Sequence, residues 1–320
     1  MEQSEKSAAI RVVRYGDLKP CFDAFIDTRT PGSDKKENFT IIGPGVSENP
    51  NQHVHIAAPH GFNIGGARQP PGCVNSQHSH DTAEFFYVHT GIWSFDLGET
   101  GEDASIILKP GDAISIPTRV FRGFKNVGED TGFLFAVLGG DDPGRVLWAP
   151  YVFDMAEEYG LVLLENGILI DTNAGEEVSA DMQLMPATSR AQVEALQRLD
   201  DAALRRCCVL EDDEVACENT SGAQRRRLVH TQGQLNWPHE FAVEEVRLEA
   251  GASLDLGTEA HNQVVFVQAG EVDVRAGAQK RLGLGDTATI TPGLARSLHN
   301  LTGTAAIAVL VTGTTPPTAH

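Results

Sequence analysis

The strongest constraint on the fold is a succession of short apolar segments, each separated from the next by turn residues. They lie between Phe62 and Leu138 and are rich in the β-branched and aromatic side chains that favour strands. Turn pairs such as Thr90-Gly91 bound them. The segments are 84–89, 92–97, 105–108, 113–116 and 133–138. Strands this closely spaced predict an antiparallel barrel or sandwich.

The same pattern returns from about 241 to 311, after a segment of different character. In that segment, the Asn166-Gly167 pair between two apolar runs predicts a hairpin. One helix is expected from Ser189 to about Arg206, beginning with a capping box between Ser189 and Gln192.

The repeated strand pattern predicts an internal duplication. We therefore expect an all-β chain with two β domains and a connector that contains one helix. The expected parts are an N-terminal domain over residues 1–175, the connector over residues 176–235 and a C-terminal domain over residues 236–320. The stretch 32–38 has the polar, glycine-containing composition of a surface loop.

The charge of the chain argues against two classes of partner. It has 25 Lys and Arg against 44 Asp and Glu, a formal net charge of −19 at pH 7. This excess of acid disfavours a nucleic-acid-binding face and docking on anionic lipid. Residues 1–6 are polar, no segment has the length and apolarity of a membrane span, and the five cysteines lack a Cys-x-x-Cys spacing. We therefore expect a cytoplasmic protein.

The residues most suggestive of chemistry lie between Gly72 and Gly91. His78, His80 and Glu84 are all even-numbered, so a single extended strand would place them on one face. Two imidazoles and a carboxylate suit a divalent metal such as Fe(II), Mn(II), Co(II), Ni(II) or Zn(II). Such a set leaves coordination positions open for substrate or O2, as in many non-haem iron oxygenases.

This segment resembles the first motif of the cupin family, G-x5-H-x-H-x3-4-E-x6-G, at every position from Gly72 to Gly91. The second motif, G-x5-P-x-G-x2-H-x3-N, is matched at Gly111, Pro117 and Asn126. Arg119 stands in place of its glycine and Arg122 in place of its metal-binding histidine.

The resemblance implies a small jelly-roll barrel, or double-stranded β-helix, with metal ligands projecting inward. A second copy of the motif frame, from Gly251 to Asn300, lacks the ligands, because Gly257, Glu259 and Gln263 stand at their positions. The resemblance therefore implies a bicupin with one metal-binding barrel and one degenerate barrel. It also implies a homodimer or higher homo-oligomer, because cupins often assemble in this way.

Arg122 leaves three alternatives open, since a protonated guanidinium cannot bind a cation. In the first alternative, His78, His80 and Glu84 alone hold the metal, and Arg122 anchors an anionic substrate. In the second alternative, His53, His55 or His60 supplies a fourth ligand. In the third, the site is vestigial.

On the first alternative, the main functional hypothesis is a non-haem Fe(II) dioxygenase acting on a small organic or phenolic acid. Arg122, with Arg119, would neutralise the substrate carboxylate as a catalytic residue. Mn(II), Ni(II), Co(II) and Zn(II) are the alternative metals. The alternative functions are a cupin isomerase, lyase or hydrolase, and a cupin that binds a metabolite without catalysis.

Overall fold

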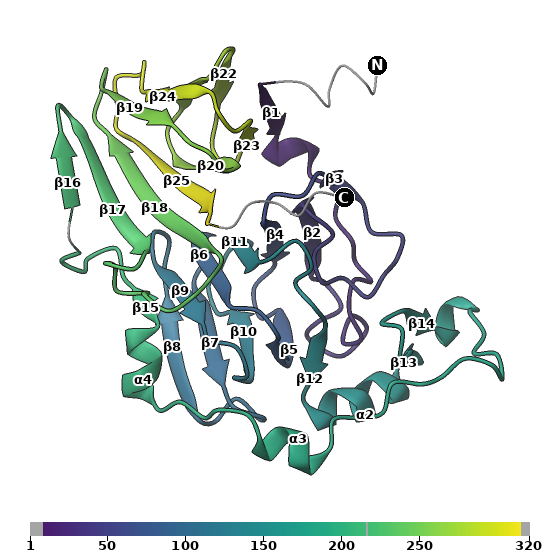
Figure 1. Cartoon of the computed structure of the whole chain (residues 1–320). Coiled ribbons are helices and arrows are strands. Elements are labelled where there is room, and N and C mark those ends of the chain that lie inside the picture. Colours follow the sequence, from purple (N-terminus) through teal and green to yellow (C-terminus); the bar gives the residue numbers. More distant parts are fainter. Residues whose placement is uncertain (1–8, 216, 315–320) are drawn as a thin grey trace. The chain divides into compact units, whose positions relative to one another are not determined.

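The computed structural model describes residues 9–215 and 217–314 and divides the chain into two compact units. The first unit comprises residues 19–57 and 63–211, and the second comprises residues 1–18, 58–62 and 212–320. Each contains a pair of β-sheets and is called the first or the second barrel below (Figure 1). The polar segment 1–6 lies outside the described residues.

The first barrel pairs a seven-stranded sheet with a five-stranded sheet. The rings of Phe86 and Phe95, one from each sheet, pack 5.3 Å apart, so the sheets face each other across an aromatic core. The larger sheet has the order β15 (Cys208–Val209), β9 (Ala113–Ile116), β6 (Glu84–Thr90), β11 (Gly132–Gly139), β4 (Phe62–Gln69), β2 (Glu37–Ile42), β3 (Val54–Ile56). The smaller has the order β12 (Val146–Trp148), β5 (Val74–His80), β10 (Arg122–Asn126), β7 (Trp93–Leu97), β8 (Ala104–Leu108).

The second barrel repeats this plan with a seven-stranded and a four-stranded sheet. Its long strands β17, β18 and β25 lie side by side in Figure 1. The larger sheet has the order β1 (Ile10–Val13), β23 (Thr287–Ile290), β20 (Gln263–Ala269), β25 (Ala306–Gly313), β18 (Phe241–Leu248), β17 (Ala223–Val229), β16 (Cys217–Thr220). The smaller has the order β19 (Ser253–Thr258), β24 (Ala295–His299), β21 (Val272–Arg275), β22 (Gln279–Leu282).

The two barrels share the same hydrogen-bonded frame, which confirms the predicted duplication. Asn126 donates from its side chain to Gln69 and Asp130 carbonyls, and Asn300 donates in the same way to Leu248 and Thr304. Both asparagines close the turn that precedes the first motif's strand. The expected all-β fold with two jelly-roll barrels is therefore present.

The expected single helix in the connector is instead two short helices, α3 (Arg190–Glu194) and α4 (Asp201–Arg206). The chain breaks between them because the Gln197 amide hydrogen-bonds to the Arg119 carbonyl and the Asp200 side chain caps a new helix. The Ser189–Gln192 capping box is present as predicted.

Other elements outside the barrels are short. The hairpin predicted at Asn166-Gly167 forms between β13 (Leu161–Leu163) and β14 (Leu169–Asp171). An unpredicted helix, α2 (Pro150–Glu158), begins with proline at its first turn, and 3-10 turns span Tyr15–Asp17 and Thr172–Ala174. No helix in the described part of the chain has the length and apolarity needed to cross a membrane.

Two details of the N-terminal region differ from expectation. The stretch 32–38 is not simply a surface loop, because the Lys36 side chain is fully buried and strand β2 begins at Glu37. Strand β1 lies in the second barrel, since its residues pair with β23. The expected parts over residues 1–175, 176–235 and 236–320 remain a prediction.

Candidate metal centre

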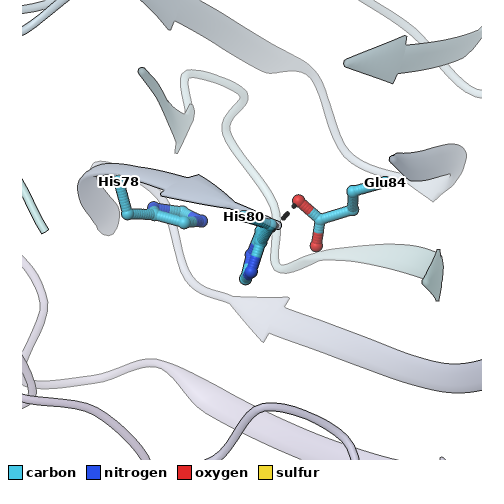
Figure 2. Close-up of side chains that lie close together, drawn as sticks. All are labelled: His78, His80 and Glu84. Carbon is cyan, nitrogen blue, oxygen red and sulfur yellow. Dashed lines mark ion pairs between the residues drawn. The ribbon is translucent and has the colours of Figure 1, made fainter. Parts of the chain in front are cut away.

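His78, His80 and Glu84 converge inside the first barrel, with one potential ligand atom from each lying within 4.8 Å of the others (Figure 2). They form the one such group of His, Cys, Asp or Glu side chains among residues 9–215 and 217–314. The expectation that these three residues lie on one face of a single strand is wrong. β5 ends at His80 and β6 begins at Glu84, so the chain crosses between the two sheets and the ligands approach from both.

The His78 ring is held in one tautomer. Its Nδ1 donates a hydrogen bond of 2.7 Å to the Ser76 carbonyl, which leaves Nε2 with a lone pair. Burial, and then the charge of Arg122, lower the pKa of His78 to about 3. The ring is therefore neutral at physiological pH, as a metal ligand must be.

A buried ion pair supports the peptide that orients His78. The Asp27 carboxylate accepts a 3.0 Å hydrogen bond from the Ser76 amide and pairs with Lys36. Both charged side chains are fully buried. Burial by itself would raise the pKa of Asp27, but the Lys36 charge and the hydrogen bonds lower it below its ordinary value. Lys36, Asp27 and Ser76 thus form a continuous polar chain to the imidazole.

His80 offers a buried nitrogen without a partner. Its Nδ1 has no hydrogen-bond partner within the described chain, and its Nε2 lies 3.6 Å from Glu84 Oε2. Burial, followed by the charges of Arg122 and His78, lowers its pKa well below the ordinary value. An orphaned buried nitrogen costs about 1–3 kcal/mol. The donor set therefore fits a divalent transition metal, which would satisfy that nitrogen.

Arg122 lies against the carboxylate of this group. Its guanidinium donates to Glu84 Oε2 at 2.7 Å and has no exposed surface. Burial raises the pKa of Glu84, and the Arg122 charge opposes that shift. Arg122 faces His78 across the β5–β10 pairing, so it stands beside the three candidate ligands, as the motif position predicts. Its Nε has no partner among the described residues.

The three side chains line a cavity of about 70 Å³ within the first barrel. A bound water needs roughly 10–15 Å³ of such space, so the cavity accepts a ligand about as large as a few waters. The wall combines apolar side chains with several amides and hydroxyls. The lining includes the amides of Asn38, Gln52, Asn63 and Asn75 and the aromatic rings of Phe39, Phe86, Phe124 and Trp148.

Trp148 joins the centre to a second buried acid. Its ring packs 5.2 Å from that of His78, and its Nε1 donates to Glu48 Oε1 at 2.6 Å. Glu48 Oε2 also accepts from the Ile26 amide at 2.7 Å. Burial raises the pKa of Glu48 to about 8, despite these two donors.

Comparison with known proteins identifies the domain that carries this centre. Residues 67–138 match the family model described as "Cupin domain". The first barrel is a cupin domain. A search of curated protein sequences finds no match.

Solved structures show that the bicupin fold extends over the whole chain. An oxalate decarboxylase of Lactobacillus farciminis in complex with formate has a TM-score of 0.59 at 10% identity, over 96% of this chain and 86% of that one. An oxalate decarboxylase of Bacillus subtilis has a TM-score of 0.59 at 11% identity, over 96% of this chain and 77% of that one. At this identity, the likeness establishes the fold. The chain has the two-barrel fold of a bicupin.

The second cupin barrel lacks the ligands that the first presents. At the equivalent positions, Gly257 has no side chain and the Glu259 carboxylate accepts from the Ala260 and His261 amides. Gln263 donates to the Thr312 hydroxyl at 2.9 Å. The second motif's arginine, Arg296, donates to backbone carbonyls where Arg122 pairs with a carboxylate.

The other candidate residues lie outside the cavity of the first cupin barrel. Arg119 is exposed and donates to the Ala195 carbonyl, so the structure gives it a contact with the connector in place of the expected contact with substrate. Its φ of 62° lies in the region that favours the glycine of the cupin motif. His60 bonds through both ring nitrogens to Ala58 and Thr289. The rings of His53 and His55 pack against each other, and neither residue lines the cavity.

Several residues around the cupin site escaped the sequence analysis. Asp27, Lys36 and Glu48 are isolated charges in a segment without a clear pattern, and their burial depends on contacts with distant strands. The Asp-Lys pair nine residues apart carries no local signal of a shared site. A comparison with homologues is the signal that could have found them.

Proposed function

We propose that this chain is a metal-dependent cupin enzyme that acts on a small carboxylate substrate, with lyase chemistry of the decarboxylase type. The proposal rests on the convergence of His78, His80 and Glu84 in one buried cavity beside the Arg122 guanidinium. The oxalate decarboxylases that share the fold support the choice of lyase. In a decarboxylation, the carbon–carbon bond to a carboxylate breaks, CO2 leaves and a proton takes its place.

His78, His80 and Glu84 would hold the metal. A bound divalent metal would supply Lewis-acid polarisation of a substrate oxygen. We propose Mn(II) or Fe(II) as the metal. Mn(II) centres are described for an oxalate decarboxylase of similar fold. Two histidines and one carboxylate also suit Fe(II).

The charges at the site favour an anionic substrate. Glu84 and Arg122 together are neutral, so a divalent cation leaves the buried site with an excess of two positive charges. A histidine in place of Arg122 would leave an excess of only one. An uncompensated buried charge is unfavourable, so the site favours ligands with one or two negative charges. Arg122 does not itself line the cavity, since its guanidinium donates to Glu84 and to the Val120 carbonyl, so it would favour an anionic substrate through its buried charge.

A non-haem Fe(II) dioxygenase is the second candidate. The observation in its favour is that three protein ligands converge, while the Arg122 guanidinium stands where the cupin motif has a fourth ligand. A metal held by three ligands has several coordination positions left for substrate and O2. The two candidates differ in what they consume, since only the dioxygenase has a net uptake of O2.

One set of measurements tests the proposal. Metal content of the purified protein is measured for the wild type and for His78→Ala and Arg122→His. We expect stoichiometric transition metal in the wild type, loss in His78→Ala, and tighter metal but weaker carboxylate binding in Arg122→His. Metal that is absent, and not restored by added Mn(II) or Fe(II), would refute the proposal. CO2 release without O2 uptake from a panel of small carboxylic acids supports the lyase, and O2 uptake supports the dioxygenase.

A further inference from the structure

The wall of the cavity carries amide groups that the proposed metal chemistry does not use. Asn38 lies on β2 and Asn75 lies on β5, and both line the same cavity as His78, His80 and Glu84. Asn75 lies about 10 Å along the strand from His78, at a rise of roughly 3.3 Å per residue. Asn75 therefore belongs to a part of the cavity beyond the candidate ligands.

A β-bulge brings Asn75 to the cavity. Arg122 pairs with His78, and Phe124 pairs with Asn75, so β5 contains one residue more than β10 between these two pairs. Without the bulge, the alternation of side chains would turn Asn75 away from the face that carries His78. The irregularity thus places an amide and an imidazole on the same wall.

Two of these buried amides present atoms without partners. Asn38 Nδ2, a donor, and Asn75 Oδ1, an acceptor, have no hydrogen-bond partner in the part of the chain that the structure describes. Asn38 is 7% exposed and Asn75 is 6% exposed. Asn63, on the same wall, differs: its Oδ1 accepts from the Gly45 amide and its Nδ2 donates to the Gly140 carbonyl. Gln52, a half-buried amide of the same lining, donates from Nε2 to the Thr40 hydroxyl and also has an Oε1 without a partner among the described residues. Among the four cavity amides, Asn63 is thus the one with both polar atoms paired.

We infer that the first barrel selects a carboxylic acid that carries a hydroxyl group at the end remote from its carboxylate. This inference rests on the proposed function, which assigns the carboxylate end to the metal held by His78, His80 and Glu84. A hydroxyl accepts from Asn38 Nδ2 and donates to Asn75 Oδ1, whereas a carboxylate only accepts and a methyl group does neither. A hydroxyl is also the smallest group with both capacities, as a cavity of about 70 Å³ requires.

The apolar walls suit the rest of such a ligand. Phe39, Phe86 and Phe124 line the cavity together with the two amides, so the segment between the carboxylate and the hydroxyl would contact aromatic side chains. Oxalate, with a carboxylate at each end, would leave Asn75 Oδ1 without a donor. A site built to bind a substrate hydroxyl rejects an analogue that lacks it, because buried polar atoms are then left unpaired.

Matched pairs of acids test the inference. Binding of 3-hydroxypropanoate against propanoate, and of 4-hydroxybutanoate against butanoate, is measured by anaerobic titration calorimetry on Mn(II)-loaded protein. We expect the hydroxylated acid of at least one pair to bind about tenfold more tightly than its partner, the size expected for one well-placed hydrogen bond. Equal binding within both pairs would overturn the inference.

Variants assign that preference to the two amides. Asn38→Ala and Asn75→Ala are expected to bring the ratio of affinities close to one, while the acid without a hydroxyl keeps its affinity. Asn38→Leu and Asn75→Leu, which keep the number and branching of the side-chain heavy atoms, replace them if the alanine variants do not fold. Gln69→Ala is the control: Gln69 is a buried amide whose Nε2 and Oε1 have no partner among the described residues, but it does not line the cavity. Gln69→Ala should retain the preference.

The outcomes separate this inference from the proposed function. Bound Mn(II) and bound acids without a hydroxyl preference refute the inference alone. A hydroxyl preference that persists in both asparagine variants also refutes it. A preference that depends on Asn38 and Asn75 in protein unable to bind metal supports the inference and refutes the proposed metal chemistry. Absence of both metal and acid binding refutes both.

Discussion

The two barrels share a backbone plan and differ in what their inner faces hold. The first encloses a cavity lined by imidazoles, a carboxylate and amides, next to a fully buried arginine. In the second, Val, Leu, Ile and Ala side chains form a buried hydrophobic cluster, and its described His, Cys, Asp and Glu side chains form no group able to hold a metal. The shared frame depends on residues outside those faces, such as Asn126 and Asn300. The comparison teaches that the frame can persist while the inner positions change between a site and a core.

The largest expected difference between the barrels is in metal binding. His80→Ala should lower metal affinity by more than about 100-fold, because even a lost outer partner of a metal ligand costs 10–100-fold. Glu259→Ala changes the equivalent position of the second barrel and should leave metal content unchanged. Metal content is measured by elemental analysis after dialysis. Equal losses in the two variants would show that the barrels do not differ as proposed.

The buried Lys36–Asp27 pair should give the largest effect on stability. Asp27→Ala leaves the Lys36 charge buried and unpaired, which costs about 3–5 kcal/mol in the free energy of unfolding. The double variant Asp27→Leu with Lys36→Met should recover most of this loss in denaturant unfolding, since it removes both charges. A double variant as unstable as the single one would assign the loss to the Ser76 hydrogen bond.

The buried acids of the two barrels should give opposite pH dependence. Glu48 has a pKa raised to about 8 by burial, so its contribution to stability is complete below its ordinary pKa of 4.5 and is lost as the pH rises through 8. In Glu48→Gln, the free energy of unfolding should therefore fall less between pH 4.5 and 8 than in the wild type, by an amount on the order of a few kcal/mol.

Asp273 in the second barrel has a lowered pKa, because hydrogen bonds and the charge of Arg281 outweigh its burial. Its contribution is lost as the pH falls, so Asp273→Asn should weaken acid sensitivity. Parallel pH profiles of the two variants would contradict this.

The smallest expected effect concerns one turn of the second motif. Arg119 has a φ of 62°, and Gly293 at the equivalent position has a φ of 78°. Gly293→Ala should destabilise the protein by about 1 kcal/mol, whereas Arg119→Gly should be neutral or stabilising by a similar amount. Thermal unfolding of both variants checks this. Destabilisation by Arg119→Gly would show that the contact with Ala195 outweighs the backbone strain.

The sequence predicted the parts of the molecule that depend on local pattern. Strand spacing, turn glycines and the Asn166-Gly167 hairpin are local, and they predicted two barrels and the duplication. The motif spacing also selected His78, His80 and Glu84, which the structure brings together. The even numbering of the three residues was the wrong reason to expect them together, because the chain passes from one sheet to the other before Glu84.

What could not be predicted depends on contacts between distant segments. The burial of Lys36 requires Asp27, and that pair in turn contacts the β5 strand through Ser76. The exposure of Arg119 depends on the connector, and the position of Asn75 depends on a bulge that is visible only in the pairing of β5 with β10. Composition and periodicity carry no information about these pairings.

The edge strands β1 and β15 have a consequence for dividing the chain. β15 precedes the second barrel in sequence but pairs with β9 of the first, and β1 precedes the first barrel but pairs with β23 of the second. β23 of the second barrel is thus covered by a strand from the N-terminal part of the chain, whereas β15 lies within residues 63–211 of the first barrel and covers β9 of that barrel. A gene fragment cut between the halves would encode a barrel with an open edge, and such an edge invites pairing with a second molecule. Strand β1 therefore closes an edge of the second barrel that would otherwise be open.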